Sequence, residues 1–429
     1  MTDAGHAPPV VQRPRRLRGE LRLPSDKSIA HRALIANALA AGPAAVGVRA
    51  PGDDLLSTVN CLRALGVTLH EKDGCFVLRG EIGQPAEPLN CGNSGTAMRL
   101  LAGALAGLRV SATLDGDTSL RRRPMARVAD PLTAMGATVD TSEGRAPLTV
   151  TGRRPLRGLE HRLPVASAQL LGAIALAGLA AEGETRIVSP GPTRDHTERL
   201  LAAMGAPIRR HDRLTVLAGP VRLQARSLAV PGDTSAATPW LVAASLHPDA
   251  ELRLRGVGLN PTRLAAVEAL REMGAQIVVR EAMTDGPEPS GDITVCSVDR
   301  LRPIALEGDR VAELIDELPA LAVAMASAGG ISELRDAGEL RVKESDRIAA
   351  VVAGLGAIGA RVEELPDGWR VSRGAPRDAD VVTHGDHRLA IAFAVAGLAG
   401  AAGAVRVTDP GCASVSYPTF WEDLAAVSA

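Results

Sequence analysis

The hexapeptide LTAMGA at residues 132–137 is one of five copies of a pattern in which an apolar helix end is followed by glycine and a short strand. The other copies are at residues 62–67, 201–206, 270–275 and 355–360. Their glycines, at positions 66, 136, 205, 274 and 359, are 70, 69, 69 and 85 residues apart. Self-similarity at such a spacing indicates an internal repeat.

Each copy is preceded by another helix that is rich in Ala and Leu. These helices are predicted at residues 28–41, 95–107, 167–181, 234–246 and 316–329, and a sixth at 386–400 has its own second helix at about 418–427. Strand-like runs such as 149–150, 187–188, 252–254, 277–279 and 405–407 fall between the helices. The pattern therefore predicts six units, each roughly a βαβαββ fold of about 70 residues.

Units of this size, with their own strands and buried helices, suit globular packing better than a solenoid. We predict an α/β fold of two domains with three units each, one at residues 26–231 and the other at residues 13–25 plus 232–429. The strand at residues 17–23 is expected to complete the sixth unit, in the second domain, so the chain would cross between the domains twice.

Composition narrows the class of partner. The chain has 48 basic and 49 acidic residues, which gives no electrostatic footprint for nucleic acid or for an anionic membrane. Five scattered cysteines form neither a disulfide framework nor a CxxC pair, which favours the cytoplasm, and nine histidines show no metal-ligand spacing. Residues 389–405 are uncharged but interrupted by glycines, so we expect a buried helix and a turn there rather than a membrane span.

Each of the six Ala-rich helices begins with a polar cluster, at residues 25–28, 92–96, 167–169, 232–235, 316–317 and 384–388. Helix capping explains the Ser, Thr, Asp and Asn residues. It does not explain Lys27, Arg32, His387 and Arg388, because cations at a helix N-terminus oppose the macrodipole. An anion bound between the helix N-terminus and the cation would interact favourably with both. We therefore predict a cleft between the domains, walled by helix N-termini and arginines, for a ligand with several negative charges.

Lysine is rare in this chain. Only Lys27, Lys72 and Lys343 occur among the 48 basic residues, and a lysine, unlike an arginine, can give up its proton. Lys72 precedes Asp73-Gly74 and looks like part of a surface turn. Lys27 and Lys343 stand in polar motifs and are candidates for chemistry.

Lys343 belongs to LRVKESDR at residues 340–347, where we expect a strand end to meet a helix start. On the functional interpretation, Lys343 and Arg347 hold anions while Glu344 moves a proton. The alternative is that Glu344 and Asp346 are a capping pair. A second basic motif, RRRP at residues 121–124, is expected to open the second helix of its unit, and one of its arginines is a candidate for the cleft.

Residues 354–359 match the dinucleotide-binding pattern GxGxxG. That motif must follow a strand and open a helix, whereas here a helix precedes and a strand follows. We therefore predict no nucleotide site.

Eight motifs resemble the 5-enolpyruvylshikimate-3-phosphate synthase (3-phosphoshikimate 1-carboxyvinyltransferase) family. In chain order they are LPSDKSIAHR, GNSGTAMR, RRPMARV, SAQLLGAIALAG, RDHTERLL, IDELPALAVA, LRVKESDR and GDHRLAIAFA. The resemblance implies an enolpyruvyl transferase-like fold of two domains, each with three βαβαββ units, joined by two crossovers. It also implies transfer of the enolpyruvyl group of phosphoenolpyruvate to the 5-hydroxyl of shikimate 3-phosphate, with release of phosphate and without a metal or organic cofactor. We expect a cytoplasmic monomer whose partners are these two small molecules.

The resemblance also implies residue roles. Shikimate 3-phosphate would meet Lys27, Ser28, Arg32, Ser167, Gln169, Arg194, Asp316 and Lys343, with Arg194 on its phosphate. Phosphoenolpyruvate would meet Lys27, Gly95, Arg123, Gln169, Arg347 and Arg388, a site that glyphosate occupies in this family. Asp316 would take the proton from the attacking hydroxyl, while Glu344 or Lys27 would protonate the methylene carbon. Many members carry a lysine shortly before the C-terminal aromatic-Pro pair. Here residues 413–416 (ASVS) precede Tyr417-Pro418 and contain no lysine. The sequence therefore leaves open whether phosphoenolpyruvate has a fourth cationic contact.

Two alternatives stand beside this interpretation. UDP-N-acetylglucosamine enolpyruvyl transferase resembles the same fold but carries a reactive cysteine in the loop before its Arg-Pro, and residues 111–122 contain no cysteine. A non-catalytic anion-binding protein on the same scaffold would have no reason to keep Lys27, Asp316 and Glu344 together. An assay of phosphate release separates an enzyme from such a non-catalytic protein.

Overall fold

The computed structural model describes residues 9–282 and 286–428, and in it each of the five repeat glycines ends a helix in the left-handed conformation. Their φ angles lie between 89° and 112°, a region that glycine enters without the penalty of a Cβ atom. The helices that they end are α2 (Asp53–Ala64), α5 (Ala126–Met135), α7 (His196–Ala203), α9 (Ala265–Glu272) and α12 (Arg347–Ala357). The strands that follow are β4 (Thr68–Lys72), β8 (Thr138–Ser142), β13 (Ile208–His211), β17 (Gln276–Ala282) and β21 (Arg361–Leu365). The predicted order of helix, glycine and strand is confirmed.

The chain divides into two compact units. Among the described residues, unit 1 holds 9–24, 232–282 and 289–428, and unit 2 holds 25–231 and 286–288. Residues 286–288 stand in the chain between two strands of unit 1, β17 and β18 (Ser290–Cys296). This short segment adds to the two crossings expected from the repeat.

Unit 2 contains three sheets of one topology. Their strand orders are β15-β3-β5-β4, β6-β7-β9-β8 and β10-β12-β14-β13, with β11 also beside β12. The strands not yet bounded are β3 (Ala44–Gly47), β5 (Cys75–Arg79), β6 (Leu89–Asn90), β7 (Ser111–Asp115), β9 (Arg145–Thr151), β10 (Leu156–Arg157), β11 (Glu160–Arg162), β12 (Ala181–Val188), β14 (Leu214–Gly219) and β15 (Leu228–Ala229). In each sheet a short strand pairs in parallel with the next one, and the remaining pairs are antiparallel.

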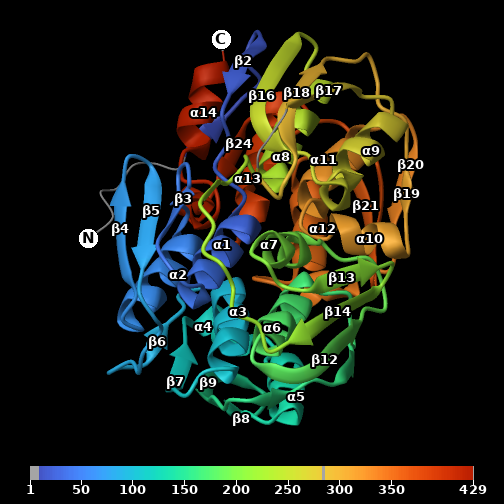
Figure 1. Ribbon diagram of the computed structural model, residues 1–429. Helices are drawn as coiled ribbons and strands as arrows, with labels where there is room; N and C mark the ends of the chain where they lie inside the picture. Colours follow the sequence, from blue (N-terminus) through green and yellow to red (C-terminus); the bar gives the residue numbers. More distant parts are fainter. Residues whose placement is uncertain (1–8, 283–285, 429) are drawn as a thin grey trace. The chain divides into compact units, whose positions relative to one another are not determined.

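The buried helices of unit 2 are α1 (Lys27–Leu39), α3 (Gly95–Ala106) and α6 (Ala168–Gly178), and α3 packs against both of the others (Figure 1). Small residues allow the close approach of α3 and α6. A Cβ atom at Gly103 would lie 2.1 Å from the carbonyl oxygen of Ala173, so only glycine fits at this crossing. The Ala-rich composition of these helices therefore reflects backbone contact.

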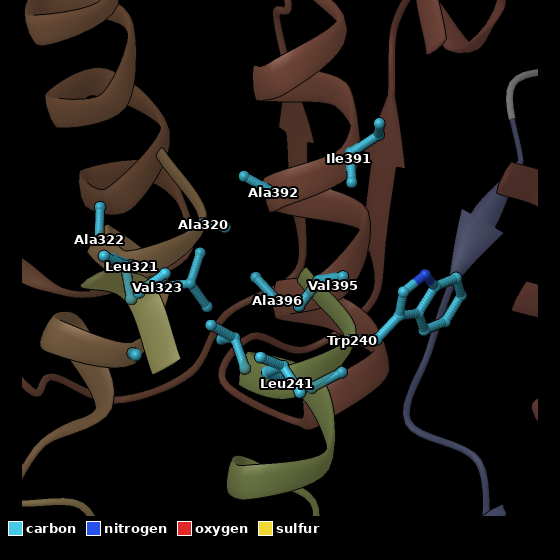
Figure 2. Close-up of a cluster of buried hydrophobic side chains, with 14 of the residues drawn as sticks. Trp240, Leu241, Ala320, Leu321, Ala322, Val323, Ile391, Ala392, Val395 and Ala396 are labelled. Atoms are coloured by element: carbon cyan, nitrogen blue, oxygen red, sulfur yellow. The ribbon is translucent and has the colours of Figure 1, made fainter. Parts of the chain in front are cut away.

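Unit 1 also contains three sheets, ordered β17-β18-β16-β2, β19-β20-β22-β21 and β1-β24-β23. Its remaining strands are β1 (Val10–Val11), β2 (Leu17–Leu21), β16 (Ala250–Gly258), β19 (Ala305–Leu306), β20 (Ile331–Leu334), β22 (Gly368–Ser372), β23 (Ala379–Val381) and β24 (Val405–Val407). Its core helices α8 (Thr234–Leu246), α11 (Leu318–Ser327) and α13 (His387–Ala399) pack against one another. Figure 2 shows buried residues of all three, among them Leu241, Leu321 and Val395, gathered in one cluster.

The expectation that the strand at residues 17–23 completes the sixth unit is wrong. β2 pairs in parallel with β16 in the sheet of the fourth unit, from Leu17 beside Ala250 to Leu21 beside Leu254. The sixth sheet takes β1 instead, which runs antiparallel to β24. Both Leu17 and Leu21 are buried in the core of unit 1. An alternating pattern predicts that a strand forms but does not specify its neighbour, and this is the physical reason for the error.

Two further expectations are confirmed. The GxGxxG match at residues 354–359 spans the end of α12 and the turn before β21, the reverse of the order in a dinucleotide site. The uncharged run at residues 389–405 is the buried helix α13, followed by a turn into β24. No helix in the described ranges 9–282 and 286–428 has both the length and the apolar character needed to cross a membrane.

Candidate active site

Side-chain caps stand at the starts of five core helices. Asp26, Ser94, Ser167, Asp233 and Asp386 each accept a hydrogen bond from a backbone N–H of the first turn of α1, α3, α6, α8 and α13 respectively. Capping thus accounts for much of the polar clusters. The cations that stand beside these caps need a separate explanation.

In unit 2, Lys27 is the first residue of α1 and lies beside a carboxylate that the sequence analysis missed. Its Nζ donates to Asp54 Oδ2 at 2.9 Å, and the Asp54 side chain is only 9% exposed. Asp54 is the second residue of α2, where a carboxylate also complements the helix dipole. Burial, with Lys27 and Arg32 nearby, lowers the pKa of His31 to about 3, so this imidazole is neutral at neutral pH.

Arg32 is buried and joins three helices. Its Nε donates to Thr197 Oγ1 at 2.7 Å, its Nη1 to the carbonyl of Ser28 at 3.0 Å, and its Nη2 to the carbonyl of Ala168 at 2.8 Å. Burial lowers its pKa to about 10, and the charge of Arg194 adds to this lowering. Arg32 and Arg194 therefore concentrate positive charge where α1, α6 and the loop before α7 meet.

Two guanidinium groups lie over the start of α3. A Cβ atom at Gly95 would be 2.6 Å from Arg99 Nη1 and 3.1 Å from Arg123 Nη1. Arg123 is buried and donates from Nη2 to Asn93 Oδ1 at 2.5 Å. A helix N-terminus with two arginines beside it is suited to an anion.

Arg99 was missed as a site residue, although it ends the quoted GNSGTAMR motif. Four residues after Gly95, it lies on the same face of α3. Its Nη1 donates to Gln169 Oε1 at 2.7 Å, and Gln169 Nε2 donates to Thr96 Oγ1 at 2.8 Å. Gln169 thereby ties the first turn of α6 to the first turn of α3.

The basic run at residues 121–123 lies elsewhere than expected. Arg121 and Arg122 end a short helix, α4 (Thr118–Arg122), instead of opening the second helix of the unit, which is α5. Both are exposed, and Arg121 pairs with Asp115. Arg123 alone of the three turns inward, consistent with one arginine being a candidate for the site.

In unit 1, Arg347 is the centre of a charged cluster. Its side chain is 1% exposed, and it meets Glu344 Oε2 at 2.7 Å and Asp386 Oδ2 at 2.8 Å. Asp316 Oδ1 lies 3.7 Å from Arg347 Nη1 and 3.5 Å from Lys343 Nζ. Burial alone would lower the pKa of Arg347, but the carboxylates of Asp386 and Glu344 raise it well above its usual value, so it stays charged.

The local structure around Lys343 corrects one expectation. A 3-10 helix, η2 (Gly338–Val342), precedes Lys343 in place of the predicted strand end. Of the suggested capping pair, Asp346 does cap α12 by accepting from the N–H of Ala349 at 3.1 Å, whereas Glu344 pairs with Arg347. Asp386 was missed as a partner of Arg347, although its position before Arg388 in the GDHR motif is a signal.

A small cavity in unit 1 joins the starts of three core helices. It is lined by residues of α8, α11 and α13 and their caps, among them Asp233, Asp316, Glu317 and Arg388. Ser416 and Tyr417 also line it, after the short 3-10 helix η3 (Pro410–Val415) that holds most of the ASVS segment. The predicted site residues Asp316 and Arg388 therefore line the same cavity within this unit.

A sequence model described as EPSP synthase (3-phosphoshikimate 1-carboxyvinyltransferase) matches residues 11–424. The chain belongs to this family. A 3-phosphoshikimate 1-carboxyvinyltransferase of Roseiflexus castenholzii is 49% identical over 425 residues, which cover 96% of this chain and 98% of the relative. One from Gloeobacter violaceus is 48% identical over 422 residues, which cover 96% of this chain and 97% of the relative.

Solved structures agree with the fold. EPSP synthase from Acinetobacter baumannii superposes with a TM-score of 0.85 at 37% identity, over 98% of each chain. The enolpyruvyl transferase NikO from Streptomyces tendae superposes with a TM-score of 0.74 at 21% identity, over 97% of this chain and 96% of NikO, a likeness of fold alone. The predicted fold class, the enzyme class and the reaction are confirmed: the chain transfers the enolpyruvyl group of phosphoenolpyruvate to shikimate 3-phosphate in the shikimate pathway. The two alternatives are set aside.

Proposed function

We propose that the two clusters are the two parts of one active site, with the residue roles that the family resemblance implies. In unit 2, the residues that would bind shikimate 3-phosphate are Lys27, Ser28, Arg32, Ser167, Gln169 and Arg194. Those that would bind phosphoenolpyruvate are Lys27, Gly95, Arg123 and Gln169. In unit 1, Asp316 and Lys343 would meet the phosphorylated acid, and Arg347 and Arg388 the phosphoenolpyruvate. The observation that carries this assignment is that cationic side chains gather at helix N-termini within each unit. Cationic side chains and helix N-termini both bind anions, and the two substrates carry several negative charges.

The chemistry requires proton transfers in two directions. Addition of the 5-hydroxyl to phosphoenolpyruvate needs a base for the hydroxyl and an acid for the methylene carbon, and elimination of phosphate removes a proton from the methyl group so formed. Asp316 is suited to be the base, since Lys343 and Arg347 lie 3.5 Å and 3.7 Å from its Oδ1 and stabilise an ionised carboxylate. Glu344 or Lys27 would protonate the methylene carbon. The arginines would offset the negative charges of the phosphate and the carboxylate of phosphoenolpyruvate.

Phosphate release is the direct test of the proposed substrates. We expect the purified chain to release inorganic phosphate from phosphoenolpyruvate when shikimate 3-phosphate is the acceptor. With UDP-N-acetylglucosamine in its place, release should stay at the background rate. Equal release with both acceptors, or with neither, would contradict the assignment.

We also propose that the domains are residues 26–231 and residues 13–25 plus 232–429, with the active site in the cleft between them. Neither unit alone supplies all of the proposed contacts, so binding both substrates should draw the domains together. Small-angle scattering should then show a smaller radius of gyration with shikimate 3-phosphate and glyphosate present than without ligands. UDP-N-acetylglucosamine is the control and should leave the radius as it is; an unchanged radius with both ligands would count against closure.

Replacing Gly95 by alanine should weaken glyphosate more than phosphoenolpyruvate. The added methyl group would sit 2.6 Å from Arg99 Nη1 and 3.1 Å from Arg123 Nη1, so the guanidinium groups must shift. Glyphosate is longer than the substrate and has less room to adjust. We expect its inhibition constant to rise about tenfold more than the KM for phosphoenolpyruvate, a difference of about 1.4 kcal/mol.

The matched control is Gly356→Ala in α12, where a new methyl group would meet only Val362 Cγ1 at 3.8 Å. That variant should keep both constants. Equal losses for inhibitor and substrate in Gly95→Ala would mean that this position does not set the discrimination. Residues 167–169 and 194–198 resemble a branch of the family that includes glyphosate-tolerant members. The inhibition constant of glyphosate must therefore be measured for the wild type as well.

We propose, finally, that the enzyme is a monomer and acts in the cytoplasm. The lack of a disulfide pattern in the sequence supports the cytoplasmic location. Light scattering on the purified enzyme should give the mass of a single chain, and a dimer mass would contradict the proposal.

A further inference from the structure

A buried charged cluster in unit 1 takes no part in the reaction as assigned so far. Arg263, in the 3-10 helix η1 (Pro261–Arg263), is 2% exposed and lies between two carboxylates. Its Nη1 meets Glu317 Oε1 at 3.1 Å, and its Nη2 meets Asp233 Oδ1 at 3.1 Å. Ser235 completes the cluster, since it accepts from Arg263 Nη2 at 2.8 Å and donates to Glu317 Oε1.

Stability does not explain this arrangement. The side chains of Arg263, Glu317 and Asp233 are 2%, 2% and 5% exposed, so each charge has lost nearly all of its water. Desolvating an ion costs several kcal/mol, and well-packed apolar residues often stabilise a protein as well as a buried ion pair does. A role in fixing geometry is the better-supported use of such clusters in some proteins.

The cluster connects the starts of two core helices. Asp233 caps α8 by accepting from the N–H of Ser235 at 2.7 Å, and Glu317 directly precedes α11. Arg263 bonds to both, so its planar fork holds the first turn of α8 against the first turn of α11. Asp233 and Glu317 also line the cavity that Asp316 and Arg388 share.

Glu317 is the residue next to Asp316. Asp316 is drawn from one side by Lys343 and Arg347, at 3.5 Å and 3.7 Å from its Oδ1. The backbone that carries it must therefore be held from another side if the carboxylate is to keep one position. We propose that Glu317, anchored by Arg263, is a positioning residue for Asp316 in enolpyruvyl transfer. This proposal rests on the assignment of Asp316 as the base.

The charges around Asp316 give the proposal a measurable sign. The positive charges are those of Lys343, Arg347 and Arg388, on α12, on α13 and in the segment before α12. Negative charges come from Glu344 and Asp386 beside Arg347, and from Glu317 and Asp233 at the starts of α11 and α8. Arg263 on η1 opposes the charges of Glu317 and Asp233. Replacing Glu317 by glutamine removes a negative charge next to Asp316. Because a nearby negative charge disfavours an ionised carboxylate, Asp316 should then stay ionised at lower pH than in the wild type. The acid limb of the kcat profile should move in that direction.

The main experiment measures Glu317→Gln with phosphoenolpyruvate and shikimate 3-phosphate. We expect kcat to fall about 10-fold to 100-fold, because small misplacements of a reacting group have effects of this size. Both KM values should stay within about twofold, and the acid limb should move to lower pH. A kcat within twofold of the wild type with the acid limb in place, or a loss confined to KM, would overturn the proposal.

A second variant covers the case in which Glu317→Gln does not fold. The triple variant Glu317→Leu, Arg263→Met and Asp233→Asn replaces the ion pair by apolar side chains, a change that buried ion pairs often tolerate, and leaves a neutral cap on α8 in place of the second carboxylate. It should unfold at a temperature close to that of the wild type and still lose kcat 10-fold or more. Wild-type turnover in this variant would show that the cluster is only structural. If both variants fail to fold, the cluster is a folding requirement and the positioning role is rejected.

Glu333→Gln is the matched control. Glu333, on β20 beyond the C-terminal end of α11, accepts from Arg335 Nε at 2.6 Å and from Arg370 Nε at 2.9 Å. It loses the same charge in the same unit and should keep kcat and its pH profile. Failure of the wild type to release phosphate would reject the proposed substrates, whereas an active wild type with an active Asp316→Asn variant would reject the positioning role along with the base.

Discussion

Lys27→Arg should lower kcat by about 10²- to 10⁴-fold, the range expected when a group that moves a proton is removed. The substitution keeps the positive charge next to Asp54, so anion binding should largely survive. A guanidinium does not give up its proton near neutral pH, whereas the ammonium of a lysine can. Steady-state kinetics with both substrates would measure the effect, and KM for each should change much less than kcat.

Lys72 provides the control for that experiment. It is exposed at the end of β4 and belongs to the surface turn that precedes β5, so Lys72→Arg makes the same chemical change at a residue with no proposed role in binding or catalysis. That variant should turn over like the wild type. Wild-type turnover in Lys27→Arg would show that Lys27 binds charge without moving a proton.

Asp316→Asn should cause a loss of similar size, about 10²- to 10⁴-fold in kcat. Asparagine has the same shape and still accepts hydrogen bonds from Lys343, but it cannot take the proton of the attacking hydroxyl. Because the positive groups near Asp316 keep their places, we expect the KM for phosphoenolpyruvate to change little. Single-turnover measurements would show whether the slow step is the chemical one.

For this variant the control is Asp380→Asn. Asp380 lies on β23 and pairs with Arg406 at 2.9 Å, with its side chain 64% exposed. Losing an exposed ion pair has little effect, so this enzyme should retain its kcat. If Asp316→Asn were as active as Asp380→Asn, another group would have to be the base.

The parts of the structure that were predictable from sequence are those that local physics determines. A glycine in the left-handed conformation after a helix, as at Gly136, depends on a few neighbouring residues, and so does a cap such as Ser94 on α3. Repeated at intervals of 69 to 85 residues, these local signals were enough to count the units. The family motifs added a prediction of which polar helix starts carry chemistry, which the proposed variants test.

What escaped the sequence depends on contacts between distant segments. Lys27 and Asp54 are 27 residues apart, and Asp54 stands in no motif that we singled out. Arg263 and Glu317 are 54 residues apart, in different units of the repeat, and Arg263 stands in no motif that we singled out. Strand β2 was assigned to the wrong sheet for the same reason. Only the packed chain reveals which partners each side chain meets.

The pairing of β2 with β16 also has a consequence for the order of events during synthesis. Glu20 on β2 and Arg253 on β16 are 233 residues apart, and at 5–20 residues per second a ribosome takes roughly 10–50 s to make that interval. All of residues 25–231 emerge in the meantime and can fold, while the nascent N-terminal strand has nothing to join. Its exposed Arg18 and Glu20 place charge on what is then an open edge, which discourages pairing with neighbouring nascent chains during the wait.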